Sequence, residues 1–191
     1  MSGVNPEILS DIANMILVNA EACFEEASID VPTDVFVSHL KPPDDCCDWL
    51  AVWVRQLRPS ATFPTNLIAV SPPCQEAGMA ADMTLGWKRD CFPTVKDNKS
   101  DLFPAADVMQ AAADALLIEA RTIWCCLMAA YTAGQLLPRD PEPDGPQPDI
   151  VWGPMTPNRG GGCAGWEWQF TIEVPACCWS APILPGSGSG S

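Results

Sequence analysis

The sequence has few of the residues that common catalytic centres use. It contains one histidine, His39, among 191 residues, with no G-x-S-x-G nucleophile motif and no P-loop lysine. A catalytic centre needs a nucleophile with a base, a metal cluster or a phosphate-binding loop. The glycines at 160–162 precede a strand-like segment instead of a helix, so they favour a hairpin turn over a phosphate site. We therefore predict that the protein is not an enzyme and has no cofactor.

Basic residues are also scarce. Ten Lys and Arg residues stand against 24 Asp and Glu residues, and the formal net charge is −14. Proteins that bind duplex DNA gain affinity mainly from Lys and Arg contacts to phosphates, so this composition argues against a DNA-binding surface. An acidic surface suits a protein that lines a passage for DNA, because like charge keeps the polymer from sticking.

Long apolar runs are missing as well. No run reaches the roughly 18 residues that span a bilayer. The first 15 residues lack the basic start, the apolar centre and the cleavage site of a secretory signal. We therefore expect a protein that is made in the cytoplasm and has no membrane partner.

Cysteine is abundant, but its spacing is unusual. Of the ten cysteines, three pairs are adjacent in sequence, at 46–47, 125–126 and 177–178, and no C-x-x-C spacing occurs. Adjacent cysteines rarely bridge to each other, and zinc sites commonly use C-x-x-C. We expect mostly reduced and buried cysteines. Late-formed disulfides are the second interpretation and a metal site is the third.

The clearest pattern in the chain runs from Gly165 to Val174. Five apolar residues, beginning with Trp166 and Trp168, alternate strictly with Glu, Gln and Thr. This period of two predicts a long strand with one core face and one wet face. The preceding glycines and the following Pro175 bound the segment. A shorter strand at 150–155 is expected to pair with it as a hairpin.

Two helices are predicted from apolar residues at helical spacing, at 6–25 and at 104–131. The second is the longest element and would reach about 42 Å, with Glu119 on its exposed side and Gly134 as its C-cap. Its buried stripe is expected to contain Val108, Met109, Ala112, Leu116, Ala120, Ile123 and Leu127.

Further strands are predicted at 35–38, at 49–57 and at 83–89, the last extending back toward 79. The fold class is therefore α/β (α+β). We expect a mixed, mostly antiparallel sheet of four to five strands, packed by an N-terminal helix and one long helix. We expect residues 1–178 to form a single globular domain, and residues 179–191, which end in GSGSGS, to form a flexible C-terminal tail resembling an appended linker.

The candidate functional residues form two groups. Asp44, Asp45 and Asp48 lie in a proline-containing loop before a very apolar strand. They lack the D-x-D-x-D-G spacing of a calcium loop, so a solvated loop is the first interpretation, a ring-lumen or partner contact is the second and a metal site is the third. Trp152 and Trp166 lie near each other on the predicted hairpin, where core packing comes first and an interface second.

Several segments together resemble a known family. They are C-C-D-W-L-A-V-W-V-R-Q-L-R-P-S, K-R-D-C-F-P-T-V, an alanine-rich helix with an internal C-C, and G-G-C-A-G-W-E-W-Q-F-T-I-E-V. Over most of residues 5–178, the chain resembles head-to-tail connector proteins of siphophages infecting actinobacteria, in particular their tail terminators. The resemblance implies a tail-terminator-like sheet with helices against it, assembled as a hexameric ring, and it carries over no catalytic residues.

The resemblance thus implies a virion structural protein of the head–tail junction. Such a ring caps the tail tube and joins it to the neck, its partners are further copies of itself, the tail tube protein and neck proteins, and genomic DNA passes through the lumen without specific binding. Another neck ring, such as a stopper or adaptor, or the tail tube protein itself, is the nearest alternative. A small cysteine-rich binding module, held by metal or disulfides, is the alternative from a different class.

Overall fold

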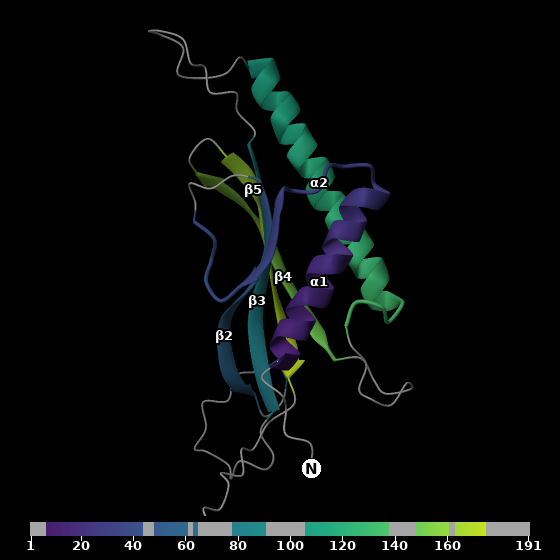
Figure 1. Cartoon of the computed structure of the whole chain (residues 1–191), viewed down its shortest axis with the longest axis vertical. Coiled ribbons are helices and arrows are strands. Elements are labelled where there is room, and N and C mark those ends of the chain that lie inside the picture. Colours follow the sequence, from purple (N-terminus) through teal and green to yellow (C-terminus); the bar gives the residue numbers. More distant parts are fainter. Residues whose placement is uncertain are drawn as a thin grey trace, which may run out of the picture.

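The computed structural model describes residues 7–43, 48–60, 63–64, 78–90, 106–137, 148–160 and 163–174. In chain order the elements are α1 (Glu7–Glu26), β1 (Asp34–Ser38), β2 (Trp49–Ser60), β3 (Gly78–Asp90), α2 (Ala106–Thr132), β4 (Ile150–Gly160) and β5 (Cys163–Val174). The strands form one sheet and the two helices lie together on one side of it (Figure 1). The expected α+β class, with an N-terminal helix and one long helix, is confirmed.

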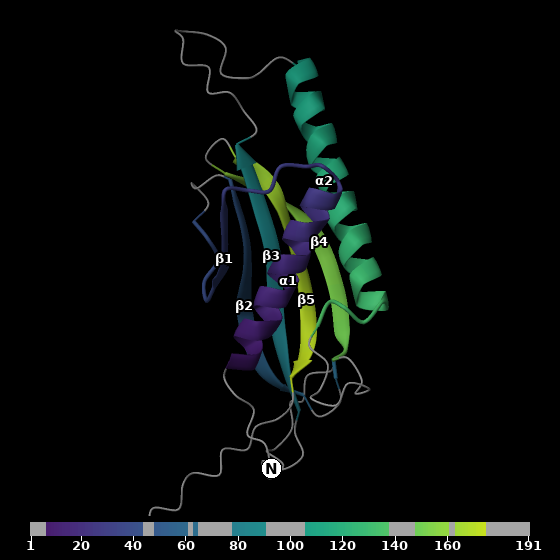
Figure 2. The same ribbon diagram turned by 45° about the vertical axis from the view of Figure 1, so that its right-hand side comes forward.

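The sheet has five strands in the order β1-β2-β3-β5-β4. Only the β1–β2 pair is parallel, and the other three pairs are antiparallel. Strands β4 and β5 form the hairpin that the sequence predicted, although β4 is longer than expected and runs to Gly160. Figure 2 shows β1 and β4 at opposite edges, with α1 in front of the sheet and α2 alongside it near β4.

Strand β5 has the predicted parity. Trp168, Phe170, Ile172 and Val174 are buried on the helix side, and their neighbours in β3 complete this part of the core. Close strand packing depends on Gly165, because a Cβ atom there would lie 1.8 Å from the carbonyl oxygen of Trp87. The face of β5 that points away from the helices is less exposed to solvent than expected, because most of its polar side chains are only partly exposed.

That second face has a small core of its own. Trp49, Ala51 and Trp53 of β2 are nearly fully buried there and form a cluster separate from the helix-side core. Gly86 of β3 leaves room for the Trp53 ring, since a Cβ would lie 2.7 Å from one of its atoms. The prediction that both faces of this strand are apolar and interior is therefore confirmed for the first half of β2.

Helix α1 packs its apolar face against the core, but Cys23 is not the reduced thiol that we expected. Cys23 forms a disulfide with Cys126 of α2, across 103 residues of sequence. Cys163 is also disulfide-bonded, and Cys125 is free and exposed. The expectation of mostly reduced cysteines is thus wrong for the described cysteines. It relied on local spacing, whereas the bridge joins two helices that only the fold brings together.

Helix α2 ends at the predicted C-cap, but fewer of its apolar residues are buried than predicted. Gly134 has a φ of 69° and its amide donates to the Tyr131 carbonyl, as in a left-handed C-cap. Only Ala120, Ile123 and Leu127 of the expected stripe are fully buried. Figures 1 and 2 show the reason: the N-terminal half of α2 extends beyond both the sheet and α1. Among the described residues, neither helix is long and apolar enough to cross a membrane.

The first turns of α2 correct the predicted stripe most clearly. Val108 and Met109 are 40% and 42% exposed, and Ala112 and Leu116 are only partly buried. Helical periodicity identifies the apolar face, but burial also requires a covering layer, and α2 has projected beyond the sheet at this point. Glu119, placed on the exposed side from the sequence, is instead mostly buried, with its side chain 12% exposed.

Candidate functional site

The structure describes Asp48 from the predicted acidic cluster, whereas Asp44 and Asp45 lie outside the described residues. Asp48 directly precedes β2 with a φ of 61°, and its carboxylate accepts hydrogen bonds from the backbone amide and the hydroxyl of Thr33. Its other oxygen lies 3.5 Å from the guanidinium of Arg89. Asp48 therefore ties the start of β2 to the turn before β1 and to the end of β3.

Arg89 is the centre of a charged cluster between the sheet and the helices. Its Nε lies 3.2 Å from a Glu119 carboxylate oxygen as an ion pair that lacks hydrogen-bond alignment. Its guanidinium also lies over the Phe24 ring, 5.2 Å from the centroid. Trp87 Nε1 donates to the second Glu119 oxygen at 3.1 Å. Burial raises the pKa of Glu119, and the Arg89 charge and the Trp87 hydrogen bond oppose that rise.

The two predicted interface tryptophans lie in the packing between the sheet and α2. Trp166 donates from Nε1 to the Leu116 carbonyl at 3.0 Å, which fastens the middle of α2 to β5. Trp152 stacks on Trp168 with ring centroids 4.4 Å apart, and Tyr131 packs edge-on against it. The Trp152 Nε1 is buried and has no hydrogen-bond partner among the described residues. The structure does not bring either tryptophan to Asp48.

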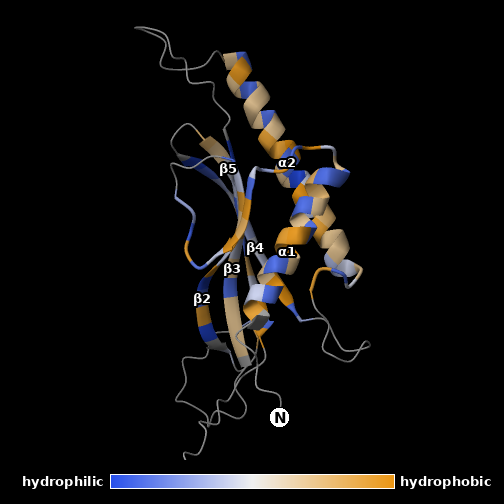
Figure 3. Cartoon of the chain, in the orientation of Figure 1, coloured by the Kyte–Doolittle hydropathy of each residue, from blue (hydrophilic) through white to orange (hydrophobic). Residues whose placement is uncertain are grey.

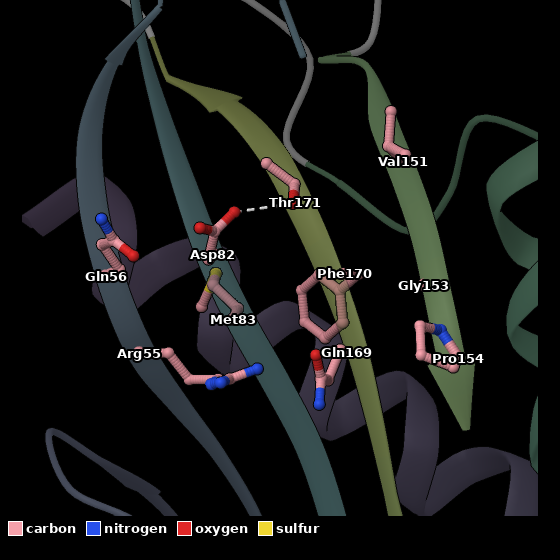
Figure 4. Close-up of a pocket in the computed structure, with 10 residues that line it drawn as sticks. All are labelled: Arg55, Gln56, Asp82, Met83, Val151, Gly153, Pro154, Gln169, Phe170 and Thr171. Carbon is pink, nitrogen blue, oxygen red and sulfur yellow. Dashed lines mark hydrogen bonds between the residues drawn. The ribbon is translucent and has the colours of Figure 1, made fainter. Parts of the chain in front are cut away.

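A groove runs across the helix-free face of the sheet, lined by described residues of four strands. One cavity of about 320 Å³ crosses β2, β3, β5 and β4, and a second of about 370 Å³ lies beside it under residues 39–41. Arg55 and Gln169 line both cavities, so we treat the two as one groove and name it the Arg55 groove. Figure 4 shows the Arg55 side chain extending from β2 across β3 toward Gln169 on β5.

Two irregularities in the sheet border the Arg55 groove. The register shifts between Val54 and Gln56 in β2, and again between Trp152 and Met155 in β4. A bulge leaves an extra residue outside the regular ladder and redirects its side chain, which is why bulges are common beside binding sites. Arg55 is the extra residue in β2.

The acids near Arg55 are already paired. Asp82 binds Arg58 at 3.1 Å and accepts a 2.7 Å hydrogen bond from the Thr171 hydroxyl. On the other side of the groove, Glu167 pairs with Lys41 at 3.0 Å and accepts a 2.7 Å hydrogen bond from Asn158.

Arg55 itself has no ion-pair or hydrogen-bond partner among the described residues. Sequence reasoning missed this residue, although a signal was present. The apolar residues of one face run Leu50, Val52, Val54 and then Leu57, and this odd step marks the bulge.

The described residues contain no group of three His, Cys, Asp or Glu side chains placed to hold a metal ion. His39 lines the second cavity together with Lys41, Thr84 and Glu167. No protein-family model and no curated protein sequence matches the chain.

Proposed function

We propose that the protein is a structural protein of the phage head–tail junction, a ring-forming tail terminator that caps the tail tube and joins it to the neck. The resemblance of its strand and helix segments to that family supports the proposal. Its acidity is in keeping with a passage for DNA, because few basic groups are available to hold phosphates. Further copies of the chain, the tail tube protein and the neck proteins are the proposed partners.

The observation that carries the proposal is the uncovered apolar surface of α2. Leu117, Ile118 and Trp124 are 55%, 61% and 51% exposed. Apolar positions continue along the projecting half of the helix (Figure 3). Exposed apolar surface of this kind marks an interaction site. In a closed ring, every subunit makes the same contact with its neighbour. A head-to-tail contact through α2 would therefore remove the exposed apolar surface of α2 from water in every subunit.

The proposed lumen is lined by carboxylates, with Asp44, Asp45 and Asp48 as the candidates. Asp48 is anchored at the start of β2, and its side chain remains 40% exposed despite its contacts with Thr33 and Arg89. A negative side chain at this position would add no phosphate contact to the moving DNA.

The test is the mass of the purified protein by analytical ultracentrifugation, followed by imaging of the particles. We expect ring particles of six subunits. The double variant Leu117→Lys, Trp124→Gln should remain folded by circular dichroism but sediment as a monomer. Leu40→Lys is the matched control, because Leu40 is 77% exposed on the helix-free side and should tolerate a charge without loss of the ring.

A wild-type protein that stays monomeric at micromolar concentration would refute the ring. If rings form and the α2 variant assembles equally well, the ring survives but its proposed contact is wrong. Another neck ring or a tail tube protein would also form rings, and imaging of whole particles distinguishes these by position.

One observation favours the second candidate, a small disulfide-held binding module. Three of the four described cysteines are disulfide-bonded, and one bridge joins the two helices. This candidate predicts a monomer that loses its fold in reducing agent. A ring protein should keep its assembled mass under the same mild reduction, so sedimentation with and without dithiothreitol separates the two.

A further inference from the structure

We propose that the Arg55 groove binds an extended acidic peptide segment, with the Arg55 guanidinium pairing with a carboxylate of that peptide. The site goes beyond the proposed function, because it lies on the sheet face opposite α2 and requires no ring. Three observations carry the inference: Arg55 has no ion-pair partner among the described residues, the charged side chains beside it are paired with one another or with Arg58, and the dimensions of the groove suit a peptide.

Among the residues that the structure describes, no acid pairs with Arg55. Arg58 and Lys41 are each paired with an acid, at 3.1 Å from Asp82 and 3.0 Å from Glu167. The groove therefore holds one excess positive charge in a chain whose formal net charge is −14. An arginine fork matches a carboxylate with two parallel hydrogen bonds, which makes a carboxylate the fitting ligand group.

The neutral groups around Arg55 suit a peptide backbone. Gln56 and Gln169 line the groove beside it, and each amide both donates and accepts hydrogen bonds. Asp82 does not repel the ligand strongly, because Arg58 neutralises its charge and the Thr171 hydroxyl donates a hydrogen bond to it. A polar groove in which the Arg55 charge has no partner among the described residues thus favours an acidic ligand.

The dimensions suit several residues of extended chain. The groove passes from β2 over β3 and β5 to Gly153 and Pro154 of β4, which are three strand spacings or about 14 Å. Four extended residues cover about the same distance. The two cavities, of about 320 and 370 Å³, fall in the range of roughly 300–1,000 Å³ for ligand pockets. Binding by a peptide would therefore fill the groove from the bulge in β2 to the bulge in β4.

The probe is a peptide of sequence DPEPDGPQPD, which is residues 140–149 of this chain and which a second copy or a similar partner could present. Its four prolines favour an extended conformation, so little ordering is needed on binding. Calorimetry should detect binding at low salt that weakens as salt rises, since exposed ion pairs are screened. A peptide with Asn and Gln in place of its Asp and Glu residues serves as the uncharged control.

The variants isolate the guanidinium. Arg55→Gln should weaken binding about ten-fold or more, the loss expected for one charge-assisted hydrogen-bonded contact. Arg55→Lys should retain part of the affinity, because the charge remains and the fork is lost. Arg159→Gln is the matched control: it removes an exposed arginine of β4 that does not line the groove and should leave binding unchanged. Circular dichroism confirms that each variant folds.

Competition with citrate distinguishes a peptide ligand from a small free carboxylate. If the peptide binds, depends on Arg55 and outcompetes citrate, the proposal stands. If citrate alone binds through Arg55, the ligand is a free carboxylate and the peptide assignment is overturned. Equal binding of the charged and uncharged peptides, equal binding to Arg55→Gln, or no binding of any probe to the folded wild type would each refute the site.

Discussion

Arg89 at the end of β3 and Glu119 in the middle of α2 form an ion pair with 3.2 Å between Nε and Oε1, and both side chains are nearly covered. The pair joins the sheet to the helix layer at a point where Trp87 also donates to the same carboxylate. Burying a charge is costly unless it is paired and hydrogen-bonded, and this arrangement supplies both.

The first prediction concerns the pH dependence of this pair. Burial raises the folded-state pKa of Glu119 above its ordinary value of 4.5, so the folded protein retains a proton that the unfolded chain has lost. The stabilisation from this group is thus fully present below about pH 4.5 and is lost as the pH rises through the raised pKa. Compared with Glu119→Gln, the wild type should gain stability as the pH falls from neutral toward 4.5. Urea unfolding of both proteins across that range tests this, and a difference that does not change with pH would contradict it.

The second prediction concerns the core row of β5. Trp168→Ala should lower the free energy of unfolding by about 3–5 kcal/mol, because the vacated space cannot close and its stacking partner Trp152 loses contact. The Nε1 hydrogen bond to the Gly153 carbonyl is lost as well. Glu173→Ala is the control on this strand, because Glu173 is exposed, whereas Glu167 on the same face is ion-paired. Equal urea midpoints for the two variants would show that the strand register is wrong.

The third prediction separates the roles of Asp48. Asp48→Ala removes the acceptor for Thr33 and places alanine at a φ of 61°, so it should cost about 1–2 kcal/mol. Asp48→Asn keeps an acceptor and tolerates this backbone conformation, so it should lose only the partly screened charge pair with Arg89 and cost clearly less. Denaturant unfolding at neutral pH measures both. An asparagine variant as unstable as the alanine variant would mean that the charge dominates.

The fourth prediction concerns the disulfide. Replacing Cys23 and Cys126 together by alanine should destabilise the oxidised protein by about 2–4 kcal/mol, because the bridge closes a loop of 103 residues in the unfolded chain. Reducing agent should destabilise the wild type more than this double variant. Cys125→Ala, which removes a free and exposed thiol, serves as the control. Peptide mapping that recovers Cys23 and Cys126 as separate free thiols would contradict the pairing.

Most of the fold could be predicted because its elements have strong local patterns. The alternation in β5 and the spacing in α1 reflect burial directly, and the structure confirms them. Val108 and Met109 show the limit of that reasoning, because periodicity identifies an apolar face but not whether another layer covers it.

The candidate site was less predictable than the fold. The Cys23–Cys126 bridge and the Arg89–Glu119 pair join residues far apart in sequence, so no spacing rule finds them. The apolar spacing of β2 could have marked a bulge at Arg55, but the groove beside it depends on the pairing of four strands, because a bulge in β2 and another in β4 border it.

The bridge between α1 and α2 has a consequence for how the protein opens. The two helices cover the same sheet face, and the covalent bond prevents either from moving far from the other at the linked turns. Local unfolding that detaches one helix from the sheet must therefore also strain or detach the other helix. Amide hydrogen exchange in the turns around Cys23 and Cys126 should then proceed through one shared opening event, and the helix layer behaves as a single cooperative unit.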